Sequence, residues 1–341
     1  MIFLYLKRIG SQTVRLELPP SVIGHACVVG KKEGKGPLRD SFDHISEDSY
    51  FGEKSWEKAE SQMQKLAFET ACEKAGLSPA DIDYLFAGDL LNQCTASAFS
   101  MRDTGIPFFG LYGAYSTMAE SLSLAAMAID GGFARLTAAV TSSHFCSAER
   151  QFRFPLEYGG QRTPTAQWTA TSAGGIVLCL DGNGPYITHI TTGKIIDAGI
   201  TDGNNMGAAM APAAFDTLIQ HMKDTGRSPD YYDLIVTGDL GKIGHAVVTD
   251  FFRDEGYDIS SNYNDCGLML FDTSAQDVHS GGSGCGCSAG VLCGHILNGI
   301  KSGLYKKVLF AATGALMSPT SSGQGESIPG ICHAVAIASE V

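Results

Sequence analysis

The stretch GLSPADIDYLFAGDL at residues 76–90 returns 150 positions later as GRSPDYYDLIVTGDL at residues 226–240. The two copies share Gly, Ser, Pro, Asp, Gly, Asp and Leu at seven of fifteen positions, which is more than chance agreement gives. Each copy contains a Ser-Pro turn, then a short apolar run, then Gly-Asp. The chain therefore carries a duplicated structural unit.

The segment before each copy predicts a helix. Ser55 is of a residue type that caps helix N-termini, and side chains suited to a buried face follow it at spacings of three and four. A similar pattern precedes the second copy. The positions at this spacing are Trp56, Ala59, Met63, Leu66, Ala67 and Thr70 in the first helix, and Phe215, Leu218, Ile219 and Met222 in the second.

A second match lies at an offset of 172, between residues 113–143 and 285–315. Its identities are fewer, but both stretches read as a small-residue turn, a helix, a glycine stop and a strand. A third pair, at residues 173–180 and 333–339, predicts a closing strand for each half. The paired residues of the second match include Ser116 and Ser288, Gly131 and Gly303, and Thr141 and Thr313.

Strands that alternate with helices predict an α/β fold whose mainly parallel sheets are covered on both faces. We expect two halves, residues 1–181 and 182–341, packed about a pseudo-twofold axis. That symmetry would bring the turns at residues 113–116 and 285–288 toward one shared cleft. Function is expected in this cleft, because ligands of open α/β sheets bind beyond the carboxyl ends of strands.

Composition narrows the classes of function. The chain has 341 residues and a formal net charge of −12, from 24 basic and 36 acidic residues, so nucleic acid is not expected as a partner. The start, MIFLYLKRIG, is too short and too charged for a signal peptide or a membrane span. Most of the ten cysteines that the chain contains lie in apolar segments, which fits a soluble protein in a reducing compartment.

Eight stretches carry a resemblance to a known family. The chain resembles the thiolase superfamily and, more closely, its stage V sporulation protein AD family, which belongs to the SpoVA group of spore formers. The stretches are GPLRDSFD (36–43), KSWEKAE (54–60), AGDLLNQ (87–93), SSHFCSAERQFRFPLEYGGQ (142–161), GITDGNNMGAAMAPAA (199–214), NDCGL (264–268), GGSGCGCSA (281–289) and ATGALMSPT (312–320).

The resemblance implies a thiolase-like fold, with two five-stranded mixed sheets in a layered α-β-α-β-α arrangement. It also implies binding of dipicolinic acid or its calcium chelate, for uptake into the developing spore and release at germination. The expected partners are other SpoVA proteins at the inner spore membrane. The expected location is the forespore or spore interior, soluble or peripheral to that membrane, and no cofactor is implied.

The resemblance further implies that three catalytic positions have been replaced. Thiolase-like enzymes place a nucleophilic Cys at the strand-to-helix turn, where this chain has Tyr115. Their Gly-His or Gly-Asn turn matches Ser283, and a further His matches the neighbourhood of Gly238 and Asp239. No catalytic residue is therefore expected, and the chain is read as a noncatalytic relative. The alternative is an acyltransferase that uses Cys287 or Cys146.

A binding cleft remains reasonable without catalysis. Backbone N–H groups at a helix N-terminus would face a ligand carboxylate as they face an oxyanion, and a guanidinium would pair with it. Arg150 and Arg153 are the candidates for that pairing; the alternative is surface ion pairing with Glu149 and Glu157. The predicted ligand-binding residues are Tyr115, Ser116, Thr117, His144, Arg150, Arg153, Asp239, Ser283, Cys285 and Cys287.

Three further features were interpreted from the sequence. Cys285, Cys287, Cys293 and His295 lack the spacing of a metal site, because six residues turn a helix by about 240°. The run GKKEGKG (30–36) lacks the P-loop pattern and reads as a solvated loop. Residues 144–168 have no counterpart of equal length in the second half. We expect this aromatic-rich insertion to cover the cleft or to form a homodimer interface.

Overall fold

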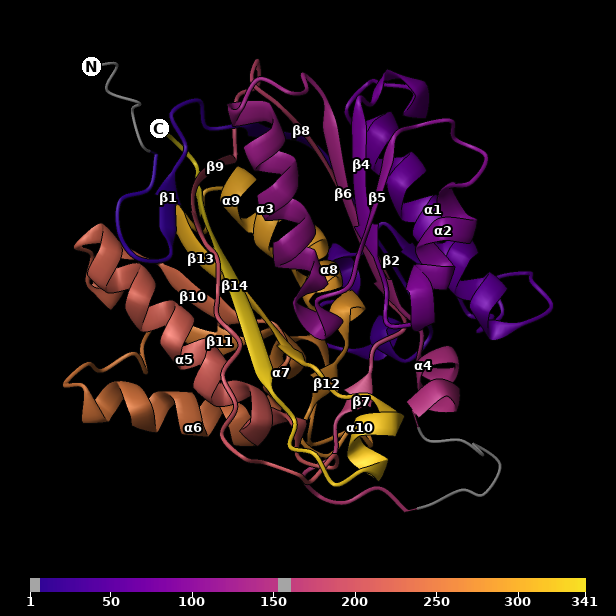
Figure 1. The fold of residues 1–341 in the computed structure, drawn as a ribbon. Helices are drawn as coiled ribbons and strands as arrows, with labels where there is room; N and C mark the ends of the chain where they lie inside the picture. The colour runs from indigo at the N-terminus through magenta and orange to yellow at the C-terminus, as the bar shows by residue number, and fades with distance from the viewer. Residues whose placement is uncertain (1–6, 153–160) are drawn as a thin grey trace.

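The computed structural model describes residues 7–152 and 161–341, and most of its strands form one large mixed sheet (Figure 1). The order of the strands in this sheet is β11-β10-β13-β14-β9-β2-β8-β6-β4-β5, with β1 added to β9 and β3 added to β2. A separate pair is formed by β7 and β12. The strands are β1 (Thr13–Arg15), β2 (Ser21–Val29), β3 (His44–Ile45), β4 (Tyr84–Gly88), β5 (Phe108–Leu111), β6 (Thr137–Ser143), β7 (Trp168–Thr169), β8 (Ser172–Cys179), β9 (Tyr186–Thr191), β10 (Leu234–Thr237), β11 (Tyr263–Asp265), β12 (Gly282–Ser283), β13 (Lys307–Ala315) and β14 (Gly330–Ala338).

The large sheet consists of two sets of five strands with the same internal order. In the first set the order is β2-β8-β6-β4-β5, and in the second it is β9-β14-β13-β10-β11. If the strands of each set are numbered along the chain, both sets read first, fifth, fourth, second, third. The sets meet where β2 pairs with β9, at Ser21 and Tyr186. The duplication predicted from the sequence is therefore present in the strand order.

The helices form three layers around these strands. Helix α1 packs against β2, β8 and β6 on one outer face, and α5 packs against β13 and β14 on the other, where it also contacts α6. Helices α3 and α8 contact each other between the two sets of strands (Figure 1). The helices are α1 (Trp56–Lys74), α2 (Thr95–Met101), α3 (Thr117–Asp130), α4 (Phe145–Phe152), α5 (Met206–Thr225), α6 (Gly241–Asp254), α7 (Cys266–Leu270), α8 (Cys285–Val291), α9 (Leu297–Lys301) and α10 (Pro319–Gly323).

Helices α1 and α5 are the predicted helical copies, and their first residues are 150 positions apart. The Ser55 hydroxyl accepts a hydrogen bond from the Lys58 N–H at 3.4 Å, as expected for an N-cap. In α5 the Asn205 side chain takes this role, and Gly226 ends the helix with a left-handed φ of 66°. Within the described parts of the chain, no helix is long and apolar enough to cross a membrane.

The interpretation of residues 30–36 as a solvated loop was wrong. Glu33 is 1% exposed, and its carboxylate accepts a hydrogen bond from the Thr171 N–H at 3.0 Å. The Lys32 ammonium lies 3.4 Å from the centroid of the Trp168 ring. The run therefore packs against the start of β8 and against β7, contacts that its local composition does not encode. Burial raises the pKa of Glu33 to about 7.

The raised pKa of Glu33 predicts a pH-dependent effect of Glu33→Gln. The ordinary pKa is 4.5, so ionised Glu33 destabilises the fold increasingly as pH rises from about 4.5 through about 7. Glutamine keeps an acceptor for the Thr171 N–H but cannot ionise. The free energy of unfolding of the variant relative to the wild type should rise between pH 5 and pH 8, by at most about 3 kcal/mol. Urea unfolding at the two pH values measures this, with Glu326→Gln at an exposed site as control. An equal effect at both pH values would contradict the prediction.

Candidate functional site

A cavity of about 410 Å³ lies where the first strand-to-helix turn meets the second half of the chain. This volume is in the range of small-molecule sites. The insertion supplies one wall, through α4 and the residues leading into β7, so its described part lines the cleft. The residues that contribute most to the argument are Tyr112, Ala114, Tyr115, Ala148, Glu149, Phe152, Gln167, Thr169 and Ser283.

The turn between β5 and α3 holds Tyr115 at the edge of the cavity. Ala114, just before it, has a φ of 50°, which is an unusual conformation for a residue with a side chain. The Tyr115 ring packs against the buried cluster of Leu90, Ala148 and Cys285. A phenol therefore occupies the turn at which a thiolase-like enzyme would present its thiol.

Ser116 and Thr117 stabilise this turn and do not line the cavity. The Ser116 hydroxyl and N–H both donate to the Gly113 carbonyl, at 2.7 and 3.0 Å. The Thr117 hydroxyl donates to the Ala114 carbonyl at 2.6 Å and accepts from the Gly113 N–H at 3.2 Å. Both side chains are fully buried. The expectation that the Ser116 N–H faces a ligand was wrong, because the turn itself uses that group.

The turn that carries Tyr115 packs closely against β13. A Cβ atom on Gly314 would lie 2.3 Å from the Gly113 carbonyl oxygen and 3.2 Å from the Ser116 nitrogen. Only glycine allows this approach of the two backbones. The second half of the chain is thus in direct contact with the turn that carries Tyr115.

Ser283 is the second predicted residue that lines the cavity. It lies on β12, which pairs in parallel with β7 so that Ser283 is opposite Thr169. Gly284 follows with a φ of 97° and turns the chain into α8. Ser283 and Thr169 therefore line the cavity side by side, one from each half.

The buried side chain of Asp239 holds the turn that follows Ser283 in place. Its carboxyl group accepts hydrogen bonds from the Gly284 N–H at 2.9 Å and from the Thr313 hydroxyl at 2.7 Å. Asp239 is fully buried, and burial raises its pKa well above the ordinary value. It is a positioning residue for the Ser283 turn and does not contact the cavity.

Asp89 and Asp239 end the two copies of the duplicated motif, yet they do different things. Asp89 accepts from the Ser97 N–H at 2.8 Å and the Ser97 hydroxyl at 2.6 Å, within its own half. Asp239 also bonds within its own half, but to the turn before α8 and to β13. The repeated Gly-Asp thus predicts a buried polar anchor but not its partners.

The two cysteines next to the cavity are buried. The Cys285 thiol donates to the Ser142 carbonyl at 3.0 Å. Cys285 and Cys287 are both 0% exposed, and burial raises the pKa of each thiol well above its ordinary value. Neither lines the cavity, so the prediction that they contact ligand is not supported. Burial in an apolar cluster accounts for both.

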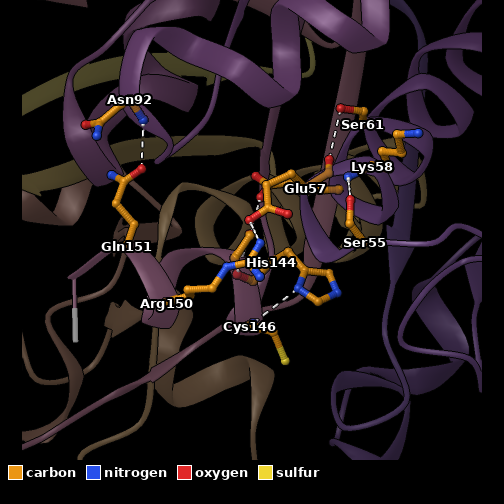
Figure 2. A network of polar contacts seen from close by, with 11 residues as sticks. Ser55, Glu57, Lys58, Ser61, Asn92, His144, Cys146, Arg150 and Gln151 are labelled. Atoms are coloured by element: carbon orange, nitrogen blue, oxygen red, sulfur yellow. Dashed lines mark hydrogen bonds and ion pairs between the residues drawn. The ribbon is translucent and has the colours of Figure 1, made fainter. Parts of the chain in front are cut away.

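Helix α4 directs different side chains to its two sides. Ala148, Glu149 and Phe152 face the cavity. On the other side, Arg150 forms an ion pair with Glu57 of α1 and lies over the Trp56 ring (Figure 2). The prediction of Arg150 as a ligand residue was therefore wrong, because that side chain faces α1. Arg153 lies outside the described residues.

Gln151 and Ser147 attach the same side of α4 to its neighbours. The Gln151 amide accepts from the Asn92 N–H at 2.9 Å (Figure 2). It also donates to the Leu90 carbonyl at 3.1 Å. The Ser147 hydroxyl donates to the buried Glu60 carboxylate at 2.6 Å. These contacts hold the wall of the cavity in place.

His144 is a structural residue. Its Nδ1 accepts from the Cys146 N–H at 3.2 Å, and its Nε2 hydrogen bonds to the Ser49 carbonyl at 2.8 Å (Figure 2). Both ring nitrogens are used and the ring is 1% exposed. His144 therefore neither lines the cavity nor is placed to activate the Cys146 thiol. The prediction that it contacts ligand was wrong because its ring is held by the loop that contains Ser49.

Gln167 is the site residue that the sequence did not reveal. Its Nε2 donates to the carbonyls of Asp239, at 2.6 Å, and Gly282, at 2.8 Å. This fixes the orientation of the amide. The side chain is 6% exposed, and its Oε1 is buried without a hydrogen-bond partner in the described part of the chain. Gln167 therefore borders the cavity with an amide whose orientation is fixed and whose buried oxygen has unused acceptor capacity.

No metal cluster is present among residues 7–152 and 161–341, where no group of three His, Cys, Asp or Glu side chains is placed to hold an ion. Cys293 lies in the π-helical segment Leu292–Ile296, which continues α8. Its thiol is directed to the Gly175 carbonyl, at 3.7 Å, whereas that of Cys285 is directed to Ser142.

Comparison with known proteins decides the family. Residues 10–338 match the family described as stage V sporulation protein AD. The chain is also 45% identical over 330 residues to stage V sporulation protein AD of Bacillus subtilis (strain 168), and the match covers 97% of each sequence. The chain belongs to the stage V sporulation protein AD family.

Solved structures confirm the thiolase-like fold of this family member. It is similar to 3-oxoacyl-[acyl-carrier-protein] synthase III from Aquifex aeolicus VF5, with a TM-score of 0.59 and 12% identity, over 94% of this chain and 99% of that one. It is also similar to cerulenin-bound OleA from Xanthomonas campestris, with a TM-score of 0.58 and 15% identity, over 94% and 96% of the two chains. At these identities the likeness shows the fold alone.

The contacts of Asp239 predict different effects for two substitutions. Asp239→Ala should lower the free energy of unfolding by about 2–4 kcal/mol, because the Gly284 N–H and the Thr313 hydroxyl lose their partner in a buried site. Asp239→Asn should stay within about 1 kcal/mol of the wild type, because an amide can accept from Gly284 and donate to the Thr313 oxygen. Urea unfolding measures both. A cost below about 0.5 kcal/mol for the alanine variant would show that Asp239 does not hold this region.

Proposed function

We propose that this member of the stage V sporulation protein AD family is noncatalytic and binds dipicolinic acid, or its calcium chelate, in the cavity between the two halves. The observation that carries the proposal is a site-sized cavity at the thiolase-like turn, where a phenol and a hydroxyl stand in place of thiol and base. The family supports the choice of ligand. In the same way we propose a role in dipicolinate uptake during sporulation and its release at germination.

The described residues offer no activated nucleophile at this cavity. Acyl transfer requires a thiolate, and nearby charges or a helix N-terminus must stabilise it. Tyr115 is at the turn, Cys285 and Cys287 are buried, and burial raises the pKa of Cys146 as well. His144 cannot assist because both of its nitrogens are engaged. Binding is the function that this arrangement supports.

The lining favours the calcium chelate over the free dianion. Among the lining residues that the structure describes there is no Lys, Arg or His, while Glu149 supplies a carboxylate. Among these described residues a free dicarboxylate would therefore meet no opposite charge. In the chelate, Ca²⁺ offsets the ligand carboxylates, and lining residues with side-chain oxygens, such as Glu149 and Ser283, suit the ion or the water molecules on it. Tyr112 and Tyr115 supply aromatic surface for a planar ring.

Calorimetric titration tests the proposal. Dipicolinate with equimolar Ca²⁺ should bind the folded wild-type chain, and more tightly than dipicolinate with a chelator present. Gln167→Ala should weaken that binding about tenfold, because the ligand loses a contact in a buried site. Gln62→Ala, at an exposed position of α1, is the matched control and should bind as the wild type does. Absence of binding at millimolar ligand by folded wild-type protein would refute the proposed function.

The alternative is an acyltransferase that uses Cys146 or Cys287. Mass spectrometry after incubation with acetyl-CoA distinguishes the two, because only an enzyme of this kind forms a covalent acyl-cysteine. We expect the mass of the intact chain to be unchanged. An added acetyl group that Cys146→Ser or Cys287→Ser abolishes would establish the alternative and remove the noncatalytic proposal.

Partners and assembly are proposed on the same basis. The family supports action together with other SpoVA proteins at the inner spore membrane, with this chain in the forespore or spore interior. A homodimer is supported by β5, which ends the large sheet. Phe108 and Phe109 on this strand are 38% and 50% exposed, and an open edge strand with apolar side chains is a surface that a second chain can extend.

A further inference from the structure

A second hollow, of about 1080 Å³, lies away from the cavity described above. It is bounded by β1, the starts of β9 and β13, the end of β14 and the loop after α5. Figure 1 shows this region beside the C-terminus, at the opposite end of the sheet from α4 and α10. Its polar lining includes Arg15, His189, Arg227, Tyr231, Tyr232 and Lys307.

Three cations of this hollow lack an acidic partner. Arg15, Arg227 and Lys307 have no carboxylate within 4.0 Å of their side-chain nitrogens, as far as the described chain goes. The chain as a whole carries a net charge of −12, so acidic partners are plentiful elsewhere. One concave surface of an acidic protein thus brings together three cations that no carboxylate pairs within the described residues.

Neutral groups hold Arg227 in place. Its guanidinium donates to the Tyr232 hydroxyl at 3.1 Å and lies 3.5 Å from the His189 Nε2. It also lies 4.2 Å from the centroid of the Tyr231 ring, and the Lys307 ammonium lies 4.0 Å from the same centroid. The guanidinium is therefore positioned without being neutralised, and the second cation is held close to it.

His189 lies close enough to Arg227 and Arg15 to be affected by their charges. It is 7% exposed and lies opposite Arg15 in the pairing of β1 with β9. Burial, together with the charges of Arg227 and Arg15, lowers its pKa to about 4. His189 is thus neutral near pH 7 and does not offset or add to the charge of the hollow.

The acidic residues of the hollow are engaged elsewhere or lie apart. Asp224 accepts from the backbone N–H groups of Ser11, Gln12 and Thr13 at 2.9–3.0 Å, which with the Gln220 amide holds its pKa at about 2. Glu17 lies 3.8 Å from the Lys7 ammonium. Glu340 also lines the hollow, and in the described parts of the chain none of the three carboxylates lies within 4.0 Å of a side-chain nitrogen of Arg15, Arg227 or Lys307.

The C-terminal end of α5 explains only part of this arrangement. Arg227 follows Thr225, the last residue of the helix, where a cation is favoured by the helix dipole. Arg15 on β1 and Lys307 on β13 have no such reason to lie here, because neither is at a helix end. An outside anion would complement all three.

We propose that this hollow is a binding site for a small polyvalent oxyanion, which Arg227 and Lys307 hold through its phosphate or carboxylate oxygens. The guanidinium keeps N–H groups beyond those that contact Tyr232 and His189, and the ammonium adds three donors. The volume exceeds that of a single phosphate group and admits a molecule with two or more anionic groups. The site is separate from the cleft and does not rest on the proposed function.

Pyrophosphate and citrate are the probes for the test, since they present phosphate and carboxylate oxygens in turn. Each is titrated calorimetrically into the full chain at constant ionic strength set with NaCl. We expect at least one of them to bind, and Arg227→Gln and Lys307→Gln each to weaken that binding about tenfold or more. Binding of one probe alone identifies which oxyanion the site takes.

Arg253→Gln is the matched control, because it removes one positive charge from α6 in the same half, where Arg253 pairs with Asp250. It should leave the affinity unchanged. If Arg227→Gln fails to fold, Lys307→Gln decides, because the side-chain contact that Lys307 makes is with the surface of the Tyr231 ring. The proposal is wrong if neither probe binds folded wild-type protein. It is also wrong if Lys307→Gln leaves the affinity unchanged. It is wrong, too, if Arg253→Gln weakens binding as much as Lys307→Gln does, because only the overall charge would then matter.

Discussion

The hydrogen bonds of the buried Asp239 carboxyl connect the parts of the chain on which the cleft depends. Asp239 follows β10, and its carboxyl group contacts the Gly284 N–H before α8 and the Thr313 hydroxyl on β13. Its backbone carbonyl also receives the Gln167 amide from the insertion. Asp239 therefore connects the second half of the chain to the cavity wall that the insertion supplies from the first half. Its high pKa is the consequence of placing an acid where water cannot reach it.

The two halves share one framework of strands and helices, but their side-chain contacts differ. Both halves have the same strand order, and each has a long helix before its copy of the repeated motif. These features follow from the repeated hydrophobic pattern. Asp89 and Asp239 occupy the same place in the repeat, but Asp89 bonds to Ser97 of α2, whereas Asp239 bonds to β13 and to the turn before α8. The insertion then breaks the symmetry, because α4 packs on α1 with one side and lines the cavity with the other. The cleft is thus asymmetric although the framework is duplicated.

Charge is distributed unevenly between the two concave surfaces. The described lining of the cleft offers hydroxyls, an amide and a carboxylate, whereas the hollow near the C-terminus gathers Arg15, Arg227 and Lys307. Desolvation raises the pKa of the thiols near the cleft and lowers the pKa of the imidazole in the hollow. In the cleft it keeps the neighbouring thiols protonated, and in the hollow it keeps His189 neutral. Different ligand chemistries are therefore expected at the two surfaces of one chain.

The sequence by itself determined the duplication, a helix before each copy of the repeat and the family, because hydrophobic spacing and motif residues are local properties of the chain. The hydrophobic pattern predicted mainly parallel sheets, whereas the central strands of each half pair antiparallel. The sequence also indicated Tyr115 and Ser283, which lie at turns that the repeat marks. Only the tertiary structure decided the directions of side chains. Arg150 lies one position from Glu149 but points to α1, Glu33 is buried by contacts with β8, and Gln167 became a cleft residue through bonds to Asp239 and Gly282. These outcomes depend on residues far away in the sequence, so no local pattern could encode them.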